Sequence, residues 1–294
     1  MKVNTPDNLK ADLPQTTWGK VLSATPVVMA VIATMLAGLA SSEMTKAQYD
    51  RSLAAQQQSK AGDQWSFFQA KKLRGSMQRS TLDVLQSIST VKPLQAGDVG
   101  GVTSDVQAAL LNGVILALPA APPLDAKIQS ALDALESGKS EPEILAALAN
   151  VPEEMLALAL RAARDRAAAF DELLKPVNQA IEQVEKARSG ADADTLRSLT
   201  AARLRYTVNR YEAEARLNQA VASYYELQVR KNNVSAERHH ARSQKFFYGM
   251  LAAQAGVIIS TFSLAARKRS MLWSLAAVAG LAAVVFAVYV YLWV

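Results

Sequence analysis

The sequence of 294 residues contains no cysteine and only two histidines, which are adjacent at His239 and His240. Without cysteine, disulfides, thiolate zinc sites, iron–sulfur clusters and cysteine nucleophiles are all excluded. Successive side chains on a helix point about 100° apart, so the two histidines are poorly arranged to bind one metal ion. The chain also has no phosphate-binding loop of the form Gly-x-x-x-x-Gly-Lys-Ser/Thr and no recognisable serine triad. We therefore expect a protein that is not an enzyme and that binds no metal or cofactor.

Acidic and basic residues are absent from three long apolar stretches, at residues 21–40, 246–266 and 272–294. A helix needs about 20 apolar residues to cross the hydrocarbon core of a bilayer, and each stretch is long enough. The first stretch follows a long polar leader and exceeds a typical signal core, which favours a membrane anchor over a cleaved signal peptide. Because the three stretches carry no charge, a proton relay or an ion-coupled transporter is not expected.

The polar region between the first two stretches lacks an excess of basic charge. Residues 41–245 carry 26 Lys and Arg and 24 Asp and Glu, which is a net charge of +2. A nucleic-acid-binding protein concentrates basic residues on its exposed surface, so nucleic acid is not an expected partner. The expected partners are the lipid bilayer, further copies of the chain, and other membrane proteins of unknown identity.

The remaining basic residues flank the membrane segments. Arg267, Lys268 and Arg269 fill the short turn between the second and third stretches, and short basic loops stay on the cytoplasmic side. The N-terminal tail then lies inside, and the polar region lies outside, which is the periplasm for a multi-pass protein of a bacterial inner (cytoplasmic) membrane. Four basic residues before the second stretch oppose this orientation: Lys231, Arg238, Arg242 and Lys245.

The polar region shows helical patterns and no strand-like alternation of useful length. Residues 42–91 contain no proline and predict a long helix that continues from the first stretch. Its apolar positions fall mostly on one face, and Pro93 with the glycines that follow ends it. Ser140 and Glu143 form a capping-box pattern that predicts a short helix. Residues 152–188 predict another helix, kinked at Pro176.

These patterns predict an all-α membrane protein with three transmembrane helices and a long helical and coiled-coil region between the first and the second. The predicted segments are an N-terminal tail (1–20), transmembrane helix 1 (21–40), a long stalk helix (41–93), a cap of short helices with Gly/Pro loops (94–150), a helical and coiled-coil stalk (151–245), transmembrane helix 2 (246–266), a basic turn (267–271) and transmembrane helix 3 (272–294).

The last helix of the polar region carries a heptad pattern, with positions alternately four and three residues apart for more than three repeats. This predicted coiled-coil seam consists of Leu204, Val208, Tyr211, Ala215, Asn218, Ala222, Tyr225 and Val229. Asn218 is its one polar member and is suited to fix the register. Continued further, the pattern reaches Phe246, so one helix is expected to run into the second stretch. His239 is either a pH-sensitive member of this seam or, as is commoner, an ordinary residue beside the membrane.

Only 19 residues are aromatic, yet three of them fall within four positions of the segment Asp63–Lys72, DQWSFFQAKK. At about 1.5 Å per residue, Trp65 lies too far along a helix from the first stretch for a membrane-interface position. Two antiparallel stalk helices would instead bring this segment to a tyrosine pair on the second stalk. We predict a clasp between the two stalks, or between neighbouring chains, formed by Trp65, Phe67, Phe68, Lys71, Tyr224 and Tyr225.

The aromatic segment and the closing hairpin, RHHARSQKFFYGMLAAQAGVIISTFSLAARKRSMLW, together resemble a family of bacterial membrane proteins known as domain of unknown function number 4337. The resemblance covers residues 20–90 and 195–294 and leaves residues 95–150 unmatched. It implies a membrane location and a helical architecture, and it implies no catalytic residues.

The function expected from these observations is that of a structural or interaction protein, assembled from several copies in the membrane. The alternative is an oligomeric channel or membrane sensor, gated through the stalk helices. For that alternative, Gln254, Ser260, Thr261 and Ser263 either line a small pore or, more commonly, hydrogen-bond a neighbouring helix.

Overall fold

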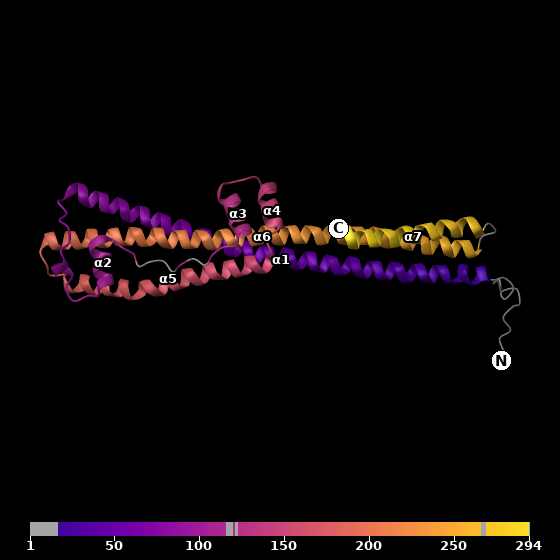
Figure 1. The fold of residues 1–294 in the computed structure, drawn as a ribbon, viewed down its shortest axis with the longest axis horizontal. Coiled ribbons are helices and arrows are strands. Elements are labelled where there is room, and N and C mark those ends of the chain that lie inside the picture. The colour runs from indigo at the N-terminus through magenta and orange to yellow at the C-terminus, as the bar shows by residue number, and fades with distance from the viewer. Residues whose placement is uncertain (1–16, 116–119, 121–122, 266–268, 294) are drawn as a thin grey trace, which may run out of the picture. The chain divides into compact units, whose positions relative to one another are not determined.

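The computed structural model describes residues 17–115, 120, 123–265 and 269–293, and its fold is shown in Figure 1. Its elements in chain order are α1 (Thr17–Ile88), the 3₁₀ helix η2 (Ala96–Val99), α2 (Ser104–Asn112), α3 (Ala126–Glu136), α4 (Glu141–Ala149), α5 (Glu153–Ala187), α6 (Ala193–Ala265) and α7 (Arg269–Trp293). The described residues form no strand, so the predicted all-α fold is confirmed.

Three of these helices, α1, α6 and α7, are long and apolar enough to cross a membrane. The apolar part of α1 lies near its N-terminus, and that of α6 lies near its C-terminus. Both helices continue unbroken beyond their apolar parts, as the sequence predicts. The chain therefore has three candidate membrane helices, with long helical segments between the first and the second.

Local sequence signals explain where several helices begin. The side chains of Ser140 and Glu143 form a capping box, with the Ser140 amide donating to Glu143 Oε2 over 3.0 Å, so α4 begins where the sequence predicts. Asp192 accepts hydrogen bonds from the amides of Asp194 and Thr195 and caps the first turn of α6. The helix α5 continues through Pro176, which removes one backbone hydrogen bond without ending the helix.

The chain divides into two compact units, the first of which contains Met1–Ser52 and Asn232–Val294. In this three-helix unit, α1, α6 and α7 pack along one another (Figure 1). Their core consists of Ala33, Leu36, Ala40, Phe246, Ala253, Ala283 and Val290. Small residues allow the backbones to approach closely, and a Cβ placed on Gly256 would lie only 3.5 Å from the Ala276 carbonyl oxygen.

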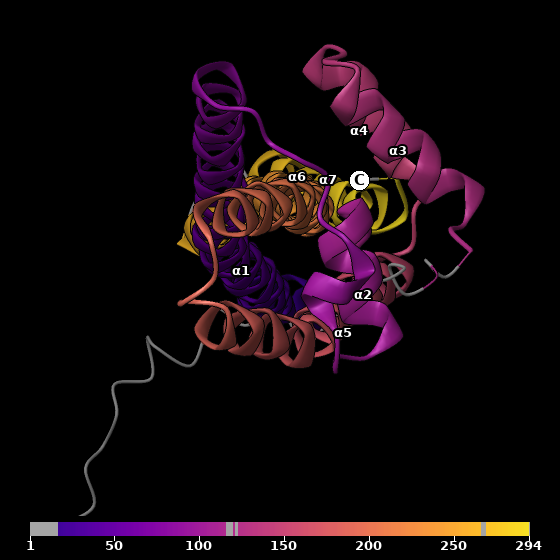
Figure 2. The same cartoon turned by 90° about the vertical axis from the view of Figure 1, so that its left-hand side faces the viewer.

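The second unit, here called the stalk unit, contains Leu53–Lys231. The helices α3 and α4 lie side by side in it as a short hairpin (Figures 1 and 2). One core joins this hairpin to α5 and α6, through residues that include Leu132, Leu148, Leu156 and Leu227. Two further clusters pack α5 against α6, one of them through Phe170, Leu174, Ala213 and Leu217. Between Val221 and Val229 nearly every residue of α6 is buried, so α6 is the central helix of this unit.

Leu156→Ala is expected to destabilise the stalk unit by about 2–5 kcal/mol, because Leu156 is 0% exposed and its removal leaves a cavity. The control is Leu158→Ala on the same helix, at a side chain that is 65% exposed, which should change stability by less than about 0.5 kcal/mol. Thermal unfolding of the full chain in mild detergent, followed by circular dichroism, measures both. Equal effects of the two substitutions would contradict the packing of α5 described above.

Candidate functional site

In the stalk unit, α1 and α6 run antiparallel and contact each other through paired side chains. Lys71 pairs with Glu214, and Lys92, which follows the end of α1, has its Nζ 2.8 Å from Asp194 Oδ2, so residue numbers rise along this segment as they fall along α6. Between these pairs, a Cβ placed on Gly75 would lie 3.5 Å from Tyr211 Cβ. The two backbones are therefore close at this glycine, and an ion pair connects the two segments on each side of it.

The predicted clasp lies in this antiparallel region. Trp65 Nε1 donates a hydrogen bond of 2.6 Å to Glu226 Oε1, and the Trp65 ring meets Phe68 edge to face, with 5.4 Å between centroids. One turn before Trp65, Ala61 packs in the same core cluster as Tyr224 and Tyr225. The structure thus brings the aromatic segment and the tyrosine pair to one part of the stalk unit. Their role as a clasp stays a prediction.

Two residues of that set lie differently from the expectation. Phe67 is 53% exposed and points away from the antiparallel contact. Lys71 contacts α6 and not the aromatic rings of its own segment, since its ammonium group pairs with Glu214 and lies 5.4 Å from the centre of the Tyr211 ring. The physical reason is the burial of the Glu214 carboxylate, which needs a cationic partner more than an exposed ring needs a lysine stem.

Glu214 is the centre of a polar network that joins α1, α5 and α6. Besides Lys71, it pairs with Arg210, whose Nε lies 3.4 Å from Glu214 Oε1. Arg210 Nη1 in turn donates to Asn178 Oδ1 over 2.9 Å, which ties α6 to α5. Burial raises the pKa of the nearby Asp171 carboxyl, and the negative charge of Glu214 raises it further. The charges that stabilise the contact of α1 with α6 thus also reach α5.

The predicted seam is largely buried within one chain. Leu204, Val208, Ala215, Ala222, Tyr225 and Val229 are buried, and Tyr211 and Asn218 are half-buried. In this structure these positions face the chain's own core, with α1 and α5 supplying neighbours. Most of the seam is therefore unavailable to a second chain, and its coiled-coil role stays a prediction.

A second buried ion pair lies in the three-helix unit, where α1 and α6 are also antiparallel. His239 Nδ1 lies 2.5 Å from Glu43 Oε2, and Lys46 Nζ lies 2.8 Å from Glu43 Oε1. One turn away, the Ser243 hydroxyl donates to the Ala40 carbonyl oxygen over 2.7 Å. Burial alone would raise the pKa of Glu43, but hydrogen bonds and charge from Lys46 and His239 outweigh it and lower that pKa.

Sequence reasoning missed Glu43 and Glu226, although a signal for Glu43 is present. The buried positions of α1 within the three-helix unit are Met29, Ala33, Leu36, Ala40, Glu43 and Ala47, which repeat the four-three spacing of a heptad. A carboxylate in such a row predicts a cationic partner on the facing helix. Glu226 has no comparable signal, because it is only half-buried and does not fall on the heptad row of α6.

The basic turn that the sequence predicts as a topology signal lies almost entirely outside the described residues. Arg267 and Lys268 lie outside the described residues, and Arg269 begins α7 without a described side chain. Within the described ranges, no group of three or more His, Cys, Asp or Glu side chains is arranged to hold a metal ion.

Residues 18–108 match the family model of a domain of unknown function (DUF4337). The predicted resemblance is confirmed over this stretch, which contains the apolar part of α1 and the Trp65 segment. The match also includes residues 95–108, where we expected no resemblance, and it does not extend to residues 195–294, where we did expect one. No curated protein and no solved structure matches the chain.

Trp65→Phe is expected to destabilise the stalk unit by about 1.5–3 kcal/mol, because it removes the donor of a hydrogen bond to a carboxylate. Phe67→Leu on the same turn is the control and should change stability by less than about 0.5 kcal/mol. Thermal unfolding in mild detergent compares these variants with Glu226→Gln and with the double variant. If the effects of Trp65→Phe and Glu226→Gln simply add, the two residues are not coupled and the contact is refuted.

Glu43→Gln is expected to change how stability depends on acid. Because the folded-state pKa of Glu43 is lowered from its ordinary value of 4.5, its ionised form stabilises the fold above that pH. The contribution is lost as the pH falls through the lowered value, so the variant should be less stable than wild type at pH 7 and should approach it progressively as the pH falls below the ordinary value. Glu237→Gln, at an exposed position, should follow the wild-type profile. Melting temperatures across this pH range measure the difference, and parallel curves for wild type and Glu43→Gln would contradict it.

Proposed function

We propose that this protein is a non-enzymatic integral membrane protein of a bacterial inner membrane that assembles from several copies and has a structural or scaffolding role. The observation that carries the proposal is an exposed apolar stripe on α1. Membrane association is supported by the three apolar helices. The orientation with the polar region outside is supported by the basic residues between the second and third apolar stretches.

The stripe is formed by Leu73, Met77, Val84 and Ile88, whose exposed fractions are 63%, 59%, 56% and 76%. At about 100° per residue, these four side chains fall within an arc of about 60° on α1. Gly75 lies on the opposite side of the helix, where it contacts Tyr211 of α6. This part of α1 therefore has one face against its own chain and one apolar face without a covering element among the described residues.

The membrane makes a second copy the natural cover for this stripe. Copies inserted in the same orientation run parallel, so that identical residues lie at the same height above the bilayer. The stripe of one chain then faces the stripe of the next, as in an interface with rotational symmetry. Four large apolar side chains at helical spacing are also what a pair of parallel helices buries between them.

Charge on α1 is compatible with this self-facing arrangement. In a parallel pair, a charged residue in the stripe would meet its own copy and be repelled. The arc occupied by the stripe contains no charged residue, whereas the surrounding helix is rich in them. The charged neighbours outside the arc are Lys71, Lys72, Arg74, Arg79 and Asp83.

The double variant Leu73→Glu/Val84→Glu is expected to convert the assembly into monomers, because four carboxylates would be brought together in each pair of chains. The control is Lys72→Glu/Gln86→Glu, which adds negative charge to exposed positions off the stripe. Light scattering of the chains purified in mild detergent gives their mass. A monomeric wild type, or a double variant with the wild-type mass, would overturn the proposal.

A further inference from the structure

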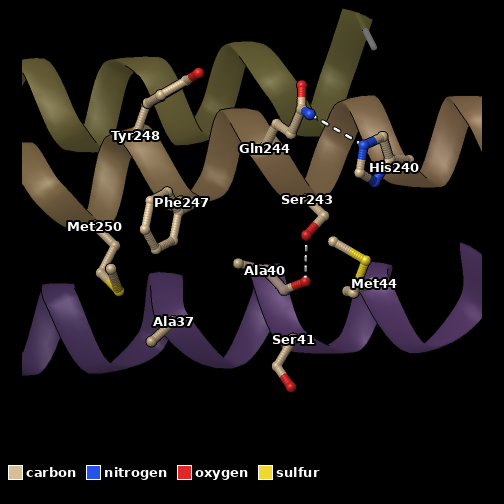
Figure 3. Close-up of a pocket in the computed structure, with 10 residues that line it drawn as sticks. All are labelled: Ala37, Ala40, Ser41, Met44, His240, Ser243, Gln244, Phe247, Tyr248 and Met250. Atoms are coloured by element: carbon tan, nitrogen blue, oxygen red, sulfur yellow. Dashed lines mark hydrogen bonds between the residues drawn. The ribbon is translucent and has the colours of Figure 1, made fainter.

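A groove of about 470 Å³ opens between α1 and α6 within the three-helix unit. Figure 3 shows its lining, which consists of Ala37, Ala40, Ser41, Met44, His240, Ser243, Gln244, Phe247, Tyr248 and Met250. The volume lies within the range of about 300–1,000 Å³ that is typical of ligand sites. Two methionines line it, and their flexible side chains suit an apolar occupant of irregular shape.

The groove is polar at one end and apolar at the other. Figure 3 shows His240 and Gln244 together at one end, and Phe247 and Met250 further along α6. The polar end lies where both apolar runs stop, because α1 is apolar up to Ala40 and α6 becomes apolar from Phe246. In a membrane this end lies at the level of the lipid headgroups, and the other end lies among the acyl chains.

The polar end offers hydrogen-bond donors and no carboxylate. The Gln244 amide lies 3.0 Å from His240 Nε2 and donates to it, which leaves the imidazole proton on Nδ1. Among the described residues Nδ1 has no hydrogen-bond partner. Buried donors without an acceptor are uncommon, and none of the ten lining residues is acidic. When the ring turns about its bond to Cβ, it gives up the contact with Gln244, and the imidazole N–H and the Gln244 amide N–H groups are then both free to donate to an oxygen acceptor such as a phosphate.

From this arrangement we propose that the groove binds one bilayer phospholipid. An acyl chain lies along Ala37, Phe247 and Met250, and phosphate or ester oxygens of the headgroup accept hydrogen bonds from His240 and Gln244. Exposed aromatic side chains at the mouth, Phe247 and Tyr248, belong to the aromatic residues that favour this level of a membrane. The site belongs to the three-helix unit and does not depend on the assembly proposed through α1.

The test uses native mass spectrometry of the full chain, delipidated in detergent and then incubated with dioleoylphosphatidylglycerol. Wild type should retain one lipid per chain, and Ala37→Trp, which fills the groove, should retain about tenfold less. Leu39→Trp is the matched control, since it places the same bulky ring at an exposed position on the same helix. This variant should retain the lipid as well as wild type does. Circular dichroism confirms that both variants are folded.

A second comparison concerns the headgroup. Wild type should retain dioleoylphosphatidylglycerol better than dioleoylglycerol, which has the same chains and no phosphate, and His240→Leu should abolish that preference while leaving the diacylglycerol bound. Inorganic phosphate alone should not compete. The proposal would be overturned if Ala37→Trp retained as much lipid as wild type. It would also be overturned if this substitution changed the mass of the assembly and left lipid retention unchanged. Competition by inorganic phosphate would also overturn it, since the site would then bind free anions.

Discussion

The packing of α1 against α6 is the constraint on which the rest of the structure depends. In each of the two units the helices are antiparallel, and each unit contains one buried carboxylate that is paired across the contact: Glu43 with His239 in one, and Glu214 with Lys71 in the other. Small residues bring the backbones close, so the carboxylates are removed from water and need their partners. The apolar rows hold the helices together, and the ion pairs decide how they are aligned.

The heptad pattern of apolar residues does not by itself fix this alignment. A shift of one heptad would leave apolar residues facing apolar residues, since alanine recurs along both rows. The same shift would separate Glu43 from His239, or Glu214 from Lys71, and leave each buried carboxylate with only the partner on its own helix, Lys46 or Arg210. Breaking such a pair is far costlier than losing one apolar contact, so each unit has a single favourable register. The pairs thus contribute specificity more than net stability.

The sequence was sufficient for the helices, the capping of α4, the unbroken run of α6 into its apolar part, and the approach of the Trp65 segment to Tyr224 and Tyr225. These features rest on local patterns or on counting residues along two helices. The contact made by Glu226 and the exposure of Phe67 could not be predicted from the sequence, because both depend on the rotation of α1 about its own axis. That rotation is set by the positions of Gly75 and Glu214, which lie on different helices, and no periodicity in one helix reveals it.

The same small residues that allow close packing also explain why a groove opens beside it. At Ala40 and Ser243 the helices α1 and α6 are joined by a 2.7 Å hydrogen bond from the serine hydroxyl to the alanine carbonyl oxygen. Beside this contact α1 presents Ala37 and Ser41, whose side chains are too short to fill the space that Phe247 and Met250 border on α6. A larger residue at Ala37 would close the groove without disturbing the bond at Ala40. A lipid chain fills the same space with no cost in helix packing, which makes the groove a consequence of the close contact and a site for the bilayer's own molecules.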